Sequence, residues 1–154
     1  MPLFSRYWIQ ERTGLTQREG LREFGPALNI EIAVPDNIAE LLNQQNLPIP
    51  PSHSHTALID SGASFTAVDE DVLVGLGLPA IDTMPISTPQ GTDTRHVYAC
   101  KISFPGTPIP PLTPIRVIGC ELQTFGHSTL IGRNILSHFL FIYNGVEGSW
   151  TLAF

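Results

Sequence analysis

Apolar and polar positions alternate with a period of two over several short stretches of the chain, which is the pattern of half-buried β-strands. The first stretch runs from Leu28 to Val34 and ends at Pro35. Further strand signals cover residues 56–59, 97–104, 115–118, 139–143 and 150–154. The Asn144-Gly145 pair between the last two stretches is a strong hairpin signal. The pattern therefore predicts an all-β fold.

Helical periodicity is confined to short segments. Asn37 and Glu40 fit a capping box at the start of one helix. Asp69 can cap a second helix that ends near Gly77. Residues 1–26 show mixed polarity and only weak periodicity. We therefore expect one or two short helices, with residues 1–26 as an N-terminal arm or extension.

Composition sets limits on the class of protein. The 154 residues fit one domain, and 42% are hydrophobic, which is enough for a core. Only 14% are charged, and 13 glycines with 14 prolines favour a β-rich fold with many turns. The net charge of −6 argues against nucleic acid and anionic membranes as partners.

The sequence also bears on the compartment. No apolar stretch reaches the roughly 18 residues of a membrane span, and the first residues lack the apolar segment of a secretion signal. Cys100 and Cys120 do not make a disulfide framework. We therefore expect reduced thiols in a cytoplasmic protein.

The most informative segment is residues 57–64, which read Ala-Leu-Ile-Asp-Ser-Gly-Ala-Ser. An apolar run brings Asp60 to the end of a strand, and the small residues after it turn the chain with little side-chain bulk. A carboxylate beside free backbone N–H groups is suited to activating water. The alternative is a strand-end aspartate that only caps a turn.

These residues resemble those of a known family. Asp60-Ser-Gly-Ala63 resembles the catalytic motif of aspartic proteases, and Thr66 follows at the spacing of the retroviral enzymes. Residues 130–134, Leu-Ile-Gly-Arg-Asn, resemble the second hallmark of retropepsins, and residues 150–154 resemble their closing strand. The resemblance covers residues 27–154, and it implies a retropepsin-like closed β-barrel that forms a single lobe.

The resemblance also implies a symmetric homodimer, because this chain carries one such aspartate and the family's chemistry uses two. Two neighbouring carboxylates share a proton. The ionised one acts as general base on water, and the protonated one hydrogen-bonds the peptide carbonyl. The implied function is an acid endopeptidase for peptide or protein substrates, with no metal and no other cofactor. The alternative is a non-proteolytic dimeric domain of the same fold that binds extended peptides or scaffolds partners.

The same resemblance assigns roles to individual residues. The catalytic residues are Asp60, Ser61 and Gly62. The residues expected to contact substrate are Ala63, Ser64, Phe65, Gln90, Gly91 and Thr92. Those expected to support the active-site turn are Thr66, Gly132, Arg133 and Asn134. Gly132 is expected to allow close packing beneath the turn, and Asn134 to hydrogen-bond near Thr66.

One position departs from the viral pattern. The viral enzymes carry an acidic residue four positions after the catalytic aspartate, where it pairs with the arginine. Ser64 stands there in this chain, so Arg133 needs another partner, either Asp69 or a backbone carbonyl. Phe65, the next residue, suggests an apolar wall of a substrate subsite.

The remaining candidates lie outside these motifs. Residues 87–94 are polar and contain glycine, which predicts the tip of a flap that closes over an extended peptide; an ordinary exposed loop is the alternative. His53 and His55 alternate in a Pro/Ser-rich loop, but no third or fourth ligand accompanies them, so a solvated loop is favoured over a metal site. The three other histidines carry no signal and are His96, His127 and His138.

The end of the chain carries a signal for assembly. Trp150, Leu152 and Phe154 alternate with other residues and predict an apolar terminal strand. An unpaired apolar edge strand is an aggregation hazard. We therefore expect it to pair with the same strand of a second subunit, with the N-terminal arm joining the sheet.

Overall fold

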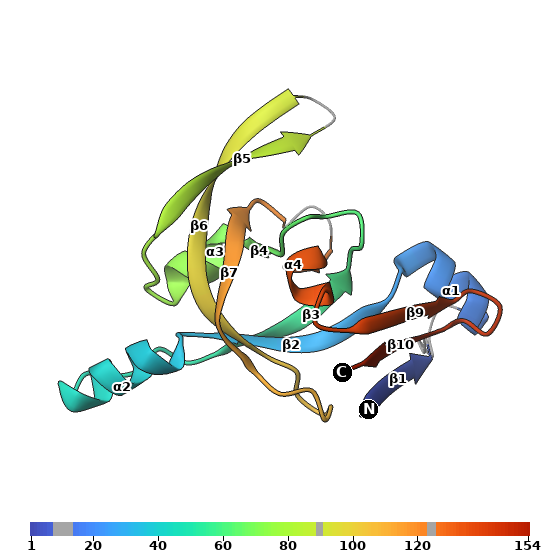
Figure 1. The fold of residues 1–154 in the computed structure, drawn as a ribbon, viewed down its shortest axis with the longest axis horizontal. Helices are drawn as coiled ribbons and strands as arrows, with labels where there is room; N and C mark the ends of the chain where they lie inside the picture. Colours follow the sequence, from blue (N-terminus) through green and yellow to red (C-terminus); the bar gives the residue numbers. More distant parts are fainter. Residues whose placement is uncertain (8–13, 89–90, 123–125) are drawn as a thin grey trace.

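The computed structural model describes residues 1–7, 14–88, 91–122 and 126–154. Most strands of this part belong to one sheet with the order β2-β3-β8-β4-β7-β6-β5. They are β2 (Ala27–Ala33), β3 (His53–Ile59), β4 (Ala67–Asp69), β5 (Asp82–Thr88), β6 (Gly91–Ser103), β7 (Leu112–Cys120) and β8 (Thr129–Ile131). β2 also pairs with β6. The fold is mostly β, as the sequence pattern predicts (Figure 1).

The period-two alternation places one set of side chains in the core. On β2, Leu28, Ile30 and Ile32 are at most 1% exposed, whereas the intervening residues are more exposed. On β6, Cys100 and Ile102 continue the same core and are fully buried. The buried faces of these strands therefore surround one apolar interior.

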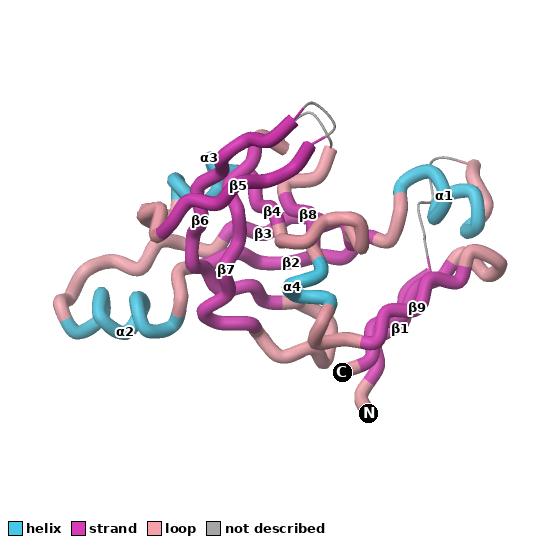
Figure 2. The backbone as a smooth tube through the Cα atoms, turned by 45° about the horizontal axis from the view of Figure 1, so that its top comes forward, coloured by secondary structure: helices cyan, strands magenta, loops and turns pink. Residues whose placement is uncertain are grey.

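Four helices occur in the described residues, rather than one or two. They are α1 (Gln17–Phe24), α2 (Asp36–Gln44), α3 (Glu70–Gly75) and α4 (Arg133–Leu136). α1 and α2 lie at opposite ends of the molecule (Figures 1 and 2). Asp69 caps α3 as predicted, by accepting a hydrogen bond from the Asp71 N–H at 3.2 Å.

The capping box lies on a different helix from the one expected. α2 follows Pro35 and has no side-chain cap, so the expectation for Asn37 and Glu40 is wrong. The box lies at the start of α1. There the Glu19 N–H donates to Thr16 Oγ1 at 3.3 Å, and the Thr16 N–H donates to Glu19 Oε2 at 2.9 Å. These reciprocal bonds satisfy N–H groups that a helix start leaves free.

A second, smaller sheet joins the two ends of the chain. β10 (Ser149–Ala153) is its central strand, between β1 (Leu3–Tyr7) and β9 (Leu140–Asn144). Both edges of β10 are thus filled by strands of the same chain. The expectation that β10 pairs with its copy in a second subunit is therefore wrong for this fold.

Residues 1–26 contribute β1 and α1. Leu21 of α1 is fully buried in the main core. Beside β1, the Phe154 N–H donates to the Pro2 carbonyl at 3.0 Å. The described part of this segment is therefore folded onto the rest of the chain.

Candidate active site

Asp60 stands directly after β3, at the start of a tight turn. Its N–H donates to the Ile131 carbonyl of the neighbouring strand β8 at 3.0 Å. Its Oδ1 accepts the Gly62 N–H at 2.9 Å, and its carbonyl accepts the Ala63 N–H at 3.2 Å. We call residues 60–66 the Asp60 loop. Its backbone bonds fix the position of the carboxylate.

Thr66 closes the loop with a set of buried hydrogen bonds. Its N–H and hydroxyl donate to Asn134 Oδ1 at 2.8 and 2.9 Å. Its hydroxyl oxygen in turn accepts the Gly132 N–H at 3.0 Å. Asn134 Nδ2 donates to the Arg116 carbonyl of β7 at 3.0 Å. The structure thus contains the predicted hydrogen bonds between Asn134 and Thr66. With the bonds to Gly132 and Arg116, they tie the loop to two other segments, residues 132–134 and β7.

Gly132 lies against the backbone of the Asp60 loop. A Cβ at this position would lie 2.4 Å from the carbonyl carbon of Phe65 and 2.7 Å from the Thr66 nitrogen. No side chain fits at such distances from backbone atoms. The close packing predicted for Gly132 is therefore present.

Arg133 reaches the loop from the start of α4. Its Nη1 donates to the carbonyls of Ser61 at 2.9 Å and Gly62 at 2.8 Å, and its Nη2 donates to Ser64 Oγ at 2.7 Å. Of the two partners left open by the sequence, a backbone carbonyl is correct. The hydroxyl of Ser64 thus contacts the arginine at the position where the viral enzymes have an acidic residue. The Gly62 carbonyl keeps a second lone pair for another donor.

Phe65 joins the loop to the neighbouring hairpin through an apolar cluster. The buried members of this cluster are Ala67, Val97, Ile118 and Leu122. Its partly buried members are Phe65, Met84, Ile86, Cys120 and Leu130. Met84 and Ile86 lie on β5, so an apolar surface runs from the Asp60 loop to the hairpin.

The hairpin of β5 and β6 carries the remaining substrate-binding candidates. It stands above the Asp60 loop and away from the smaller sheet (Figure 1). Its last described pair is Thr88 with Gly91, and Thr92 pairs with Ser87. Gln90, which was expected at the tip, lies outside the described residues. The structure therefore places Gly91 and Thr92 on an element separate from the loop.

The two alternating histidines lie on β3, whose first residue is His53, rather than in a loop. His55 Nε2 is 2.7 Å from Thr129 Oγ1. Burial, and then the charge of His53, lower the pKa of His55 to about 4. In the described part of the chain, no three His, Cys, Asp or Glu side chains group in a way that could hold a metal ion.

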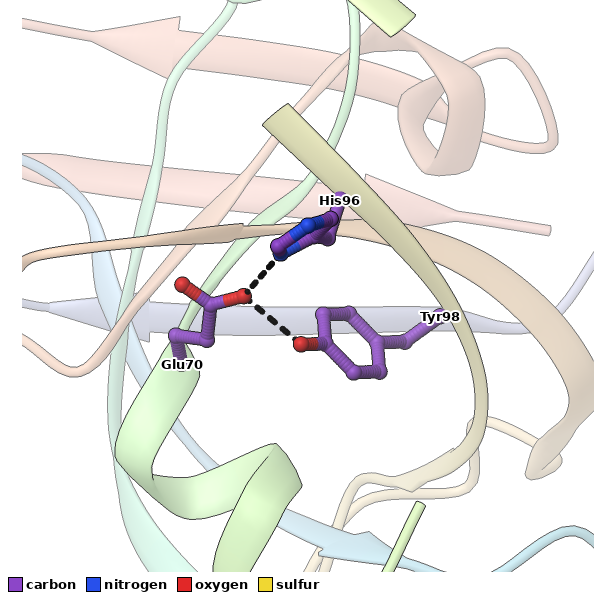
Figure 3. A network of polar contacts seen from close by, with 3 residues as sticks. All are labelled: Glu70, His96 and Tyr98. Carbon is purple, nitrogen blue, oxygen red and sulfur yellow. Dashed lines mark hydrogen bonds and ion pairs between the residues drawn. The ribbon is translucent and has the colours of Figure 1, made fainter. Parts of the chain in front are cut away.

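A polar cluster beside the hairpin was not predicted from the sequence. Glu70 Oε1 accepts the Tyr98 hydroxyl at 2.6 Å and lies 2.9 Å from His96 Nδ1 (Figure 3). We call these three residues the Glu70 cluster. They come from α3 and β6. Because these two elements are far apart in the chain, no local sequence pattern predicts the contact between them.

Comparisons with known proteins show which solved structures this fold resembles. No family model and no curated protein sequence matches the chain. A retropepsin-like aspartic protease from Rickettsia conorii has a similar structure, with a TM-score of 0.51 and 13% identity, over 98% of this chain and 91% of that one. The simian foamy virus protease matches with a TM-score of 0.45 and 20% identity, over 73% of this chain and 92% of that one.

The fold is therefore retropepsin-like, in agreement with the motifs around Asp60 and Gly132. The likeness to the Rickettsia structure extends over almost the whole chain, including the N-terminal segment. Among the described helices, none has the length and apolar character needed to cross a membrane.

Proposed function

We propose that the protein is an aspartic endopeptidase that works as a symmetric homodimer. The observation that carries this proposal is the support of Asp60. Its loop is held by Gly132, Arg133 and Asn134 within a retropepsin-like fold. A strand-end aspartate that only capped a turn would not need its loop to be bonded to three consecutive residues far along the chain. The proposed lobe is a closed barrel, and the pairing of β2 with both β3 and β6 supports this.

The chemistry follows from bringing two Asp60 carboxylates together at a two-fold axis. Because both cannot ionise at low cost, they hold one proton between them. The ionised carboxylate removes a proton from water, and the protonated one donates to the scissile carbonyl. Activity is therefore expected to follow a bell-shaped pH profile that favours pH below roughly 6–7.

The other site residues take the roles that the family resemblance implies. Ser61 supports the carboxylate pair through its hydroxyl, and Gly62 offers its carbonyl to the substrate backbone. Ala63, Ser64 and Phe65 border the bound peptide, with Phe65 as an apolar wall. Gln90, Gly91 and Thr92 act as a flap that excludes water.

The dimer needs a surface other than the edge of β10. The strand register places Leu3 of β1, Ala153 and Leu140 of β9 in one row across the smaller sheet. Leu3, Leu140 and Ile142 are 59, 53 and 48% exposed. Side chains two apart on a strand share a face, so these three lie on the same one. We infer that this apolar face contacts the second subunit.

Substitution of Asp60 tests the proposal. Asp60→Asn keeps the shape of the side chain but cannot ionise, so cleavage of a denatured protein mixture at acidic pH should be lost. The matched control is Asp36→Asn, which makes the same change at an exposed position on α2, where Asp36 pairs with Lys101. The control should cleave like the wild type. Substantial cleavage by purified Asp60→Asn would refute the assignment.

Assembly is tested by sedimentation at the assay concentration. One Asp60 cannot act as both acid and base, so the active species should be the dimer. Leu140→Glu with Ile142→Glu, on the exposed face of β9, should dissociate it. Full activity in a sedimenting monomer would contradict the mechanism.

A further inference from the structure

The Glu70 cluster lies where the hairpin leaves the body of the protein. Val97 is the residue of β6 nearest the hairpin tip that pairs with β7, through Ile118. In the described residues, the part of β6 from Gly91 to His96 pairs with β5 alone. His96 is thus the residue next to this point on the side of the tip, where β6 pairs with β5 alone. Tyr98 is the second residue on the other side, where β6 pairs with β7.

Glu70 connects this point to the Asp60 loop by a short path. It is the first residue of α3, directly after β4, which itself follows Thr66 and the loop. A single carboxylate oxygen of α3 therefore contacts β6 on either side of the point where this strand leaves β7 (Figure 3).

The backbone of β7 leaves room for the Glu70 cluster. A Cβ on Gly119 of β7 would lie 2.9 Å from Tyr98 Cε2 and 3.0 Å from both Cδ and Oε1 of Glu70. Glycine at this position lets the ring and the carboxylate lie directly over β7. Tyr98 is 4% exposed. The contact between Glu70 and Tyr98 is therefore built into the packing, whereas His96, whose side chain is 58% exposed, bonds Glu70 at the surface.

The charges around the cluster favour an ionised Glu70. The hydrogen bond from Tyr98, and then that from His96, hold the pKa of Glu70 below its usual value. Burial, and then the bond to Glu70, raise the pKa of Tyr98 to about 12, so its hydroxyl remains a donor. The other titratable and charged groups near the cluster are Arg95 and Asp93 of β6, which pair with each other at 2.7 Å, Asp69 of β4 and Cys120 of β7.

We propose that Glu70, His96 and Tyr98 are positioning residues that hold the root of the β5–β6 hairpin in place relative to the Asp60 loop, and that this hold is stronger when His96 is protonated. Protonated histidine carries a hydrogen on Nδ1 and a full positive charge, so it donates a charge-assisted bond to the carboxylate. Neutral histidine donates there in only one tautomer. The part of this inference that concerns cleavage rests on the proposed function, because the hairpin would then close over substrate at acidic pH.

Hydrogen exchange at the hairpin tests this. Protection factors, which correct for the intrinsic pH dependence of exchange, are measured for the amides of residues 83, 84, 86–88 and 92–96. The measurements are made at about pH 5.5 and about pH 8, on either side of the range in which histidine changes charge. In the wild type, protection at the lower pH should be about threefold greater, the size expected for a partly exposed ion pair. Amides of β3 and β8 serve as the internal reference and should not change.

Four variants separate positioning from a general effect on stability. Glu70→Gln and His96→Gln should lower hairpin protection about threefold at the acidic pH and remove its pH dependence. His96→Lys, which stays charged, should retain strong protection at about pH 8. His138→Gln makes the same change at an exposed site after α4 and should behave like the wild type.

The outcomes are distinct. Unchanged hairpin protection in Glu70→Gln and His96→Gln would overturn the inference, and so would an equal loss in β3 and β8. Exchange does not depend on cleavage, so a protein without protease activity can still confirm or refute the positioning role. Where cleavage is present, Glu70→Gln should raise KM more than it lowers kcat.

Discussion

The Asp60 loop and the β5–β6 hairpin face each other in the proposed site, but they are held in different ways. The loop donates hydrogen bonds to Ile131 of β8 and to Asn134, and it accepts hydrogen bonds from Gly132 and Arg133. Outside its own ladder, the hairpin is held at its root by the Glu70 cluster and by an exposed ion pair. That pair joins Asp82 to Arg116 at 2.7 Å. Met84 and Ile86 add apolar contacts further along β5.

The difference matches what each region must do in the proposed reaction. A general base must stay within hydrogen-bond reach of the water it activates, so its support should be rigid. A flap must open for substrate and close for chemistry, so it should be anchored at one end only. Variants in the loop should therefore lose much unfolding free energy. Variants in the hairpin should lose little, and their effects should stay local.

The largest effect is expected from Gly132→Ala. Its Cβ would overlap the backbone of Phe65 and Thr66, which cannot move without breaking the loop. We expect a loss of at least about 3 kcal/mol of unfolding free energy, measured by urea denaturation, or failure to fold. The matched control is Gly75→Ala in α3, where a Cβ meets nothing within 4 Å. Stability close to that of the wild type in Gly132→Ala would show that the loop adapts, and the contrast with the hairpin would disappear.

Removal of one hydroxyl beneath the loop should have an intermediate effect. Thr66→Val keeps the shape of the side chain but leaves the buried Gly132 N–H without its acceptor. An unsatisfied buried donor costs about 1–3 kcal/mol, so unfolding free energy should fall by about that amount. Thr66→Ser retains the hydroxyl and should lose less. Thr66→Ser removes only the methyl group, so a loss in Thr66→Ser as large as that in Thr66→Val would show that the hydroxyl's hydrogen bonds do not dominate at this position.

The loop was predictable from sequence because its residues form two compact motifs. Asp60-Ser-Gly and residues 130–134 each carry strong local constraints, namely a tight turn and a glycine in contact with backbone. Period-two alternation likewise identified β2, β9 and β10. In each case the cause of the structure is local in sequence, so the pattern is visible before folding.

Other features depend on partners that are distant in the chain. The strand beside β10 is β1 of the same chain. The pattern of β10 alone does not predict this, because residues 3–7 and a strand of a second subunit are equally able to pair with that edge. The Glu70 cluster joins α3 to β6 across many residues, and its members carry no shared pattern. α1 is different, because Thr16 and Glu19 do form a capping-box signal, but it lies in a segment with weak periodicity.

The smallest effect on stability is expected at the hairpin, from Ile86→Ala. Ile86 is only partly buried against the apolar cluster, so truncation should lower unfolding free energy by about 1 kcal/mol, below the range for fully buried isoleucines. The same change should raise exchange rates of hairpin amides more than those of the Asp60 loop, because the loop keeps its own hydrogen bonds to Gly132, Arg133 and Asn134. Ile86→Val, which removes one methylene, is the graded control and should show a smaller change of the same kind. If Ile86→Ala destabilised the protein as much as Thr66→Val, or raised exchange in the loop equally, the hairpin and loop would be one cooperative unit. The flap would then have to open together with the catalytic turn, which is incompatible with a fixed general base.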